Sequence, residues 1–160
     1  MEREKLFKEI IEEIDLAYDL MYEYDSLLHQ YGDHILYQEE SHLIQCIGRT
    51  PGITNNELAK ELKKTKSACS QMVKKLIEKN WVIRKKNENN NREYYLFLTE
   101  EGHKIFMDHE EFDRTCLEYK YRRLEQFSEE ELKAYLKVQK VINYTFQEDV
   151  EKSYDYFNNK

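Results

Sequence analysis

Proline and glycine are scarce in this 160-residue sequence, which contains one proline and four glycines. These residues interrupt helices and supply most tight turns, so their scarcity predicts long uninterrupted helices. The breaks that do occur are at Gly32, Gly48, Pro51–Gly52 and Gly102. We therefore expect a mainly α chain with room for one small β-hairpin.

Several other features are absent. No apolar run approaches the roughly 20 residues of a membrane span, and residues 1–20 are too charged for a signal peptide, which predicts a cytoplasmic protein. Three widely spaced cysteines do not form a disulfide framework, and we expect Cys46, Cys69 and Cys116 to be inert packing residues. The sequence has no glycine-rich phosphate loop, nucleophile motif or catalytic-metal spacing, so we expect no enzyme.

Residues 53–102 contain the clearest local signals. Thr54 and Glu57 form a T-x-x-E capping box, which begins a short helix. A break at Lys63–Thr65 is too short for a flexible linker, so the next helix must turn sharply away from the first. The pattern predicts a helix-turn-helix.

The second helix is expected over residues 66–79 and to end at Asn80, because asparagine is second only to glycine at a left-handed helix end. Cys69, Met72, Val73, Leu76 and Ile77 recur at the spacing of one buried helix face. The opposite face offers hydroxyl, amide and ammonium donors, which suit phosphates and base edges. The candidate DNA-binding residues of this helix are Lys66, Ser67, Ser70, Gln71, Lys74 and Lys75.

Two strands with a polar tip between them are expected to follow, over residues 81–86 and 93–98. Arg84, Lys86 and Arg92 flank the tip and are candidate DNA contacts, because arginine on a protruding hairpin suits a minor groove. Residues 60–92 carry a formal charge of +8 within a chain of −7, which indicates a polyanion as partner. The alternative is a solvated charged helix face.

This stretch resembles the winged helix-turn-helix of the MarR family of bacterial and archaeal transcription regulators. The matching segments are ITNNELAKEL, the SACSQMVKKL helix, NWVIR and LTEEG. The resemblance implies a homodimer that places its second helix in the major groove and its wing in the minor groove. Arg92 matches the wing arginine, whereas Asn90 replaces the usual aspartate and Asn80 the usual glycine.

Long amphipathic segments flank the module on both sides. One helix is expected over residues 2–31, ended by Gly32, and further helices over 99–127 and 128–157, the last beginning at a capping box of Ser128 and Glu131. We expect three regions: an N-terminal dimerisation helix over 1–34, the DNA-binding domain over 35–102, and C-terminal dimerisation helices over 103–160. In the family, such terminal helices intertwine into the dimer interface.

Four kinds of regulation remain open. The first is a small apolar or aromatic effector, which by the resemblance would enter a cleft beside the DNA-binding module. The residues expected to line this cleft are Tyr18, Tyr22, Tyr31, Tyr37 and Phe106. The alternative is that these aromatic side chains only pack in the core. The second kind of regulation is by zinc. We expect the protein to require no cofactor. The resemblance to zinc-sensing members implies the candidate ligands Asp25, His42, His109 and Asp113, although Asp113 stands for a histidine and His42 is displaced by one residue. Oxidation and the absence of any effector are the others.

The sequence therefore predicts a homodimeric, sequence-specific regulator of transcription, a ligand-responsive repressor that binds a palindromic operator in double-stranded DNA. The alternative is a winged helix used as a protein-interaction scaffold, since a fold does not by itself fix a function. The basic island favours DNA, because a protein-binding surface would expose apolar anchors instead.

Overall fold

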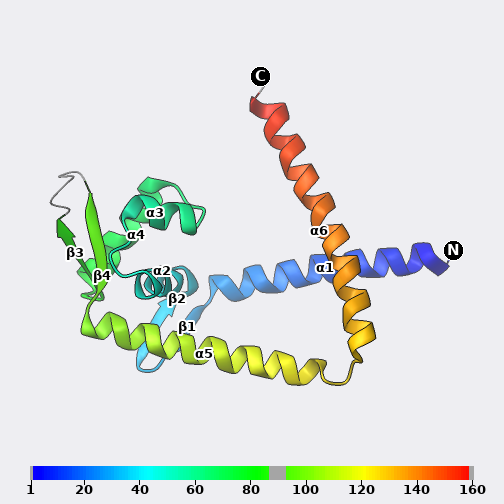
Figure 1. Cartoon of the computed structure of the whole chain (residues 1–160), viewed down its shortest axis with the longest axis horizontal. Helices are drawn as coiled ribbons and strands as arrows, with labels where there is room; N and C mark the ends of the chain where they lie inside the picture. Colours follow the sequence, from blue (N-terminus) through cyan, green and yellow to red (C-terminus); the bar gives the residue numbers. More distant parts are fainter. Residues whose placement is uncertain (1, 87–92, 159–160) are drawn as a thin grey trace. The chain divides into compact units, whose positions relative to one another are not determined.

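The computed structural model describes residues 2–86 and 93–158 (Figure 1). Its elements, in chain order, are α1 (Glu2–Ser26), β1 (Leu28–Tyr31), β2 (His34–Tyr37), α2 (Gln38–Arg49), α3 (Asn55–Glu61), α4 (Lys66–Glu78), β3 (Val82–Lys86), β4 (Tyr94–Leu98), α5 (Glu100–Leu124) and α6 (Glu129–Asn158). The chain divides into two compact units, Met1–Arg114 and Thr115–Lys160. The predicted fold class, mainly α with a winged helix-turn-helix and long terminal helices, is confirmed.

The first unit is built around one apolar core. Helices α2, α3 and α4 pack against one another and against the β3–β4 hairpin, which lies beside α3 and α4 in Figure 1. The β3–β4 pair is antiparallel, with Val82 opposite Leu98 and Lys86 opposite Tyr94. Buried side chains from these elements, from β2 and from the start of α5 form the core, including Leu36, Leu43, Ile44, Ile47, Leu58, Leu76, Val82, Leu96 and Ile105.

The two helices of the helix-turn-helix begin at side-chain caps. The Thr54 hydroxyl accepts a hydrogen bond from the Glu57 backbone N–H, and the Glu57 carboxylate accepts one from Thr54 N at 2.8 Å. The Thr65 hydroxyl caps α4 in the same way through Ala68 N. Between them Lys63 adopts φ +50°, and beyond α4 Asn80 adopts φ +59°. Both are left-handed conformations that end a helix sharply, so the predicted cap at Asn80 is confirmed.

The prediction of a single helix over residues 2–31 is wrong at its end. Helix α1 stops at Ser26, and β1 and β2 form an antiparallel hairpin in which Tyr31 pairs with His34. Gly32 is the turn of this hairpin, with φ +57°, rather than a helix cap. The strands form because alternate residues bury the His29 and Tyr31 side chains on one face.

The second unit contains the end of α5 and the whole of α6. Ser128 and Glu131 form the expected capping box at the start of α6, with the Ser128 N–H donating to the Glu131 carboxylate at 2.8 Å. Within the described residues, neither α1 nor α6 contains a buried residue. Both helices therefore expose apolar side chains along their whole length. No helix in the described ranges has the length and hydropathy needed to cross a bilayer.

Candidate nucleic-acid interface and adjoining pocket

Helix α4 presents a polar face that is opposite to its buried face. Cys69, Val73 and Leu76 are buried against the core. The other side of the helix is exposed, and it carries the predicted residues Lys66, Ser67, Ser70, Gln71, Lys74 and Lys75. The Lys74 ammonium lies 3.8 Å from the exposed Glu78 carboxylate, a contact too loose and too solvated to hold it away from a ligand. The helix thus offers hydroxyls, an amide and cations on one surface.

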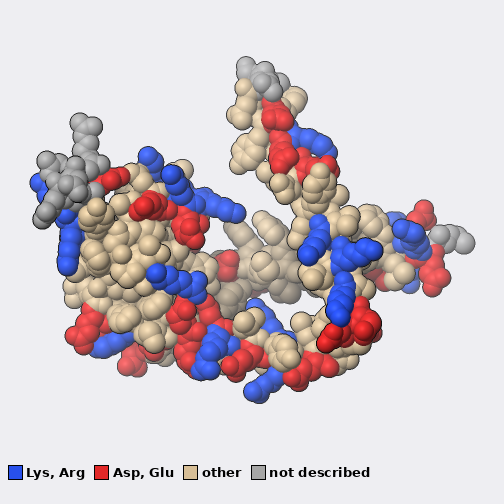
Figure 2. Space-filling view, viewed as in Figure 1, with Lys and Arg blue, Asp and Glu red and all other residues tan. Residues whose placement is uncertain are grey.

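The β3–β4 hairpin adds further cations beside this surface. Arg84, Lys85 and Lys86 are exposed, and Figure 2 shows lysine and arginine atoms along β3. The Arg84 guanidinium lies 4.8 Å from the centre of the Tyr94 ring, so the ring holds it in one orientation. The predicted wing arginine, Arg92, and the neighbouring Asn90 lie outside the described residues.

A groove of about 490 Å³ separates α4 from the hairpin. Ser70, Lys74 and Arg84 line it, together with residues that the sequence analysis did not single out: Asn55, Asn56 and Tyr94. The Asn56 amide donates to the Glu93 carboxylate at 2.8 Å, which joins the start of α3 to the hairpin. The sequence feature that could have predicted Asn55 and Asn56 as groove residues is their position directly after the Thr54 cap, since it places two amide donors at a helix N-terminus.

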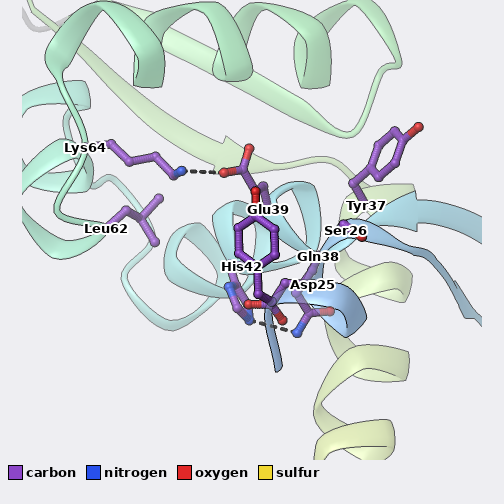
Figure 3. Close-up of a pocket in the computed structure, with 9 residues that line it drawn as sticks. Asp25, Ser26, Tyr37, Gln38, Glu39, His42, Leu62 and Lys64 are labelled. Atoms are coloured by element: carbon purple, nitrogen blue, oxygen red, sulfur yellow. Dashed lines mark hydrogen bonds and ion pairs between the residues drawn. The ribbon is translucent and has the colours of Figure 1, made fainter. Parts of the chain in front are cut away.

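A second pocket, of about 560 Å³, lies between the end of α1 and the start of α2 (Figure 3). Its lining is mixed: Asp25, Glu39, His42 and Lys64 supply charged or polar groups, and Tyr22, Tyr37 and Leu62 supply apolar surface. The figure marks the Lys64–Glu39 ion pair and the hydrogen bond of 3.0 Å between Gln38 and His42. This lining offers both polar and apolar contacts, and the small apolar or aromatic effector stays a prediction.

The predicted aromatic lining is only partly assembled here. Tyr22 and Tyr37 line the pocket, and Tyr18 is exposed elsewhere on α1. Tyr31 is 1% exposed and packs edge-on against Phe112, and Phe106 packs against the core. Those two rings therefore serve as core packing, because the β1–β2 hairpin turns Tyr31 inward.

The predicted metal ligands lie in two neighbouring groups. Asp25 and His42 line the pocket, whereas His109 and Asp113 form a cluster with Glu110 on α5. The His42 and His109 rings face each other edge-on at 6.0 Å. Glu110, which the sequence analysis missed, joins the cluster because it follows His109 directly and turns toward α2, where its carboxylate pairs with Arg49 at 2.8 Å.

The amide nitrogen of Gln45 lies at the centre of this α5 cluster. It is 2.8 Å from Glu110 Oε1, 3.0 Å from Asp113 Oδ2 and 3.3 Å from His109 Nδ1. His109 is fully buried, and its Nε2 atom has no hydrogen-bond partner among the described residues. Burial is the main cause that lowers the pKa of His109 below its usual value, so the imidazole is held in the neutral form that a metal requires.

The cysteines are placed as packing residues. Cys69 is buried on α4 and Cys46 is half-buried on α2. Burial raises the pKa of both thiols, which disfavours the reactive thiolate. This supports the interpretation of these two cysteines as inert.

Comparison with known proteins gives the same family as the motifs. Residues 36–94, from β2 to the start of β4, match the model of the MarR family. The HTH-type transcriptional regulator PchR of Bacillus subtilis (strain 168) is 33% identical over 96 residues. These residues are 60% of this chain and 57% of PchR, so the chain spans less than two thirds of that relative.

Two solved structures share the fold over most of the chain. Streptococcus pneumoniae FabT, solved in complex with DNA, is 26% identical with a TM-score of 0.69, over 90% of this chain and 99% of FabT. Lactococcus lactis ZitR, a zinc-responsive MarR family member, is 20% identical with a TM-score of 0.77, over 88% of this chain and 99% of ZitR. At that identity ZitR shows the fold alone. With the helix-turn-helix and the wing, these comparisons show that residues 36–94 of this chain form a winged helix-turn-helix module similar to that of the MarR family of HTH-type transcriptional regulators.

Proposed function

We propose that this protein is a sequence-specific DNA-binding regulator, a repressor that acts as a homodimer on a palindromic operator in the cytoplasm. The observation that carries the proposal is the exposed face of α4, where hydroxyl, amide and ammonium groups lie together beside a cationic hairpin. The fold shared with FabT, whose structure contains DNA, supports it. A helix with this surface fits the major groove, and the hairpin reaches the adjacent groove.

The exposed apolar faces of α1 and α6 support a dimer. Leu6, Phe7 and Ile10 on α1, and Leu136, Phe146 and Val150 on α6, are each at least 40% exposed. Helices of 25 and 30 residues with no buried position in the described chain need a partner surface. A second copy of the chain supplies an identical surface, and two-fold symmetry would match a palindromic site.

Replacing Lys74 with alanine is expected to weaken binding to operator and unrelated DNA alike by about tenfold at low salt, because a phosphate contact is sequence-independent. Replacing Gln71 is expected to change sequence preference, since its amide can pair with a base edge. Fluorescence anisotropy over a salt series measures both effects on a duplex selected by the wild-type protein from a random library. Lys133→Ala on α6 is the matched control. Unchanged affinity and preference in both α4 variants would refute this role for α4.

The scaffold alternative makes a different prediction in the same assay. A protein-interaction module should bind selected and unrelated duplexes equally and weakly. The described surface of α4 offers cations and hydroxyls rather than the aromatic anchors of a protein interface, which favours the regulator.

A zinc response is a second proposal, carried by the buried neutral His109 beside two carboxylates. His109, Glu110 and Asp113 would hold the ion after the Gln45 amide moves aside, and ZitR offers a zinc-responsive precedent in the same fold. Zinc would act by drawing α2 and α5 into a different packing. Oxygen and imidazole ligands of this kind fit zinc.

Zinc is therefore expected to shift the DNA affinity of the wild-type protein by about tenfold relative to chelator, a typical coupling between two sites. The shift should disappear in the His109→Ala and Asp113→Asn variants. The Asp113 side chain is 47% exposed, so this position tolerates substitution. Calorimetry of zinc binding and anisotropy with DNA are the measurements, and His103→Ala on the same helix is the control. If neither variant alters the response, the cluster is not the zinc site.

A further inference from the structure

Two adjacent carboxylates at the start of α2 contact the two ends of α4. Glu39 pairs with Lys64 at 2.5 Å, and Glu40 pairs with Lys79 at 2.5 Å. Lys64 directly precedes the residue that caps the N-terminus of α4, and Lys79 is its C-terminal cap. A single turn of α2 thus holds both ends of the helix that carries the proposed base contacts.

The pair at the C-terminal end is the more sheltered of the two. The Glu40 side chain is 14% exposed, and its second oxygen accepts a hydrogen bond from the Tyr37 backbone N–H at 3.2 Å. The Lys79 ammonium also lies 4.6 Å from the centre of the Trp81 ring. Each charge is therefore fixed by a second contact, which reduces the entropy lost when the ion pair forms.

The pair at the N-terminal end is more accessible. The Glu39 side chain is 61% exposed and the Lys64 side chain 31% exposed, and both line the pocket in Figure 3. Lys64 follows Lys63, whose left-handed backbone makes the sharp turn between α3 and α4. Holding Lys64 therefore fixes the direction in which α4 leaves that turn.

The charges of Glu39 and Glu40 are unfavourable for DNA binding on electrostatic grounds alone. Both are anionic groups on a unit proposed to bind a polyanion, and removing such charges ordinarily strengthens binding. A geometric function explains why they contact the two lysines at the ends of α4 rather than leaving those lysines free for phosphates.

We propose that Glu39 and Glu40 are positioning residues, which set the placement of α4 for base recognition through their ion pairs with Lys64 and Lys79. The inference rests on the proposed DNA-binding function. It assigns sequence discrimination to two side chains outside the face that would contact DNA.

The test compares the affinity of each variant for the selected duplex and for an unrelated duplex. Glu40→Gln is expected to lower affinity for the selected duplex by about tenfold, because a displaced helix loses aligned base contacts. Affinity for unrelated duplex should be equal or higher, because the protein gains positive charge. Glu61→Gln on α3 is the matched control: it makes the same charge change, and Glu61 forms no ion pair within the described residues. It should leave the ratio of the two affinities unchanged.

Two further measurements separate positioning from folding and from charge. Partial unfolding would reduce binding to both duplexes in proportion, so the ratio of affinities reports positioning alone. The double variant Glu40→Lys, Lys79→Glu restores an ion pair with its charges exchanged. Its ratio of affinities should be closer to that of the wild-type protein than the ratio of Lys79→Glu alone. A Glu40→Gln ratio equal to that of Glu61→Gln would overturn the inference while leaving the function intact. A wild-type protein that binds both duplexes equally would instead overturn the proposed function.

Discussion

Replacing Leu136 and Val150 of α6 with glutamate is expected to turn the dimer into a monomer and to weaken operator binding about a thousandfold. Both side chains are about half exposed in the isolated chain and lie on one face of α6. Burying four new carboxylates in a symmetric interface, two from each copy, carries a desolvation cost that apolar contacts cannot offset. Separate monomers then lose the effective concentration that links two half-site contacts.

Light scattering after size exclusion and anisotropy on the selected duplex measure the two effects. The matched control replaces Thr145 with glutamate and Lys152 with glutamine. It makes the same change in net charge, but on the opposite face of α6 by helical spacing. The control should remain dimeric and bind DNA. A dimeric Leu136→Glu, Val150→Glu protein with normal DNA binding would show that this face of α6 is not the interface.

Local signals were sufficient to predict the winged module. The T-x-x-E box at Thr54, the asparagine after α4 and the second capping box at Ser128 each specify a backbone feature within four residues, and the structure contains all three. The buried and exposed faces of α4 follow from a 3.6-residue period in the same way. Such features need no knowledge of distant contacts.

Features that depend on distant contacts could not be predicted. Leu28 and Tyr31 fit the helical spacing of α1, but alternate burial in the β1–β2 hairpin decides their conformation. The pairing of Glu40 with Lys79 and the contacts of Gln45 with α5 join residues far apart in sequence, and nothing in a one-dimensional charge pattern selects these partners.

Replacing Gly102 with alanine is expected to destabilise the protein by about 3 kcal/mol, although the same change inside a helix is usually stabilising. A methyl group at this position would lie 1.9 Å from the backbone carbonyl oxygen of Trp81. That carbonyl cannot move freely, because it accepts a hydrogen bond from Thr99 N at 3.0 Å, where β4 passes into α5. The start of α5 would have to separate from Trp81, which lies just before β3.

Thermal unfolding should show this as a fall in melting temperature of about 9 °C for a chain of this size. Gly48→Ala is the matched control. Its methyl group would lie 2.5 Å from the half-buried ring of Phe106, a side chain that can rotate where the Trp81 backbone cannot. The Gly48 variant should therefore lose less stability than the Gly102 variant. A Gly102→Ala protein as stable as wild type would mean that α5 does not pack this closely against Trp81, and that the junction between wing and α5 is looser than the structure has it.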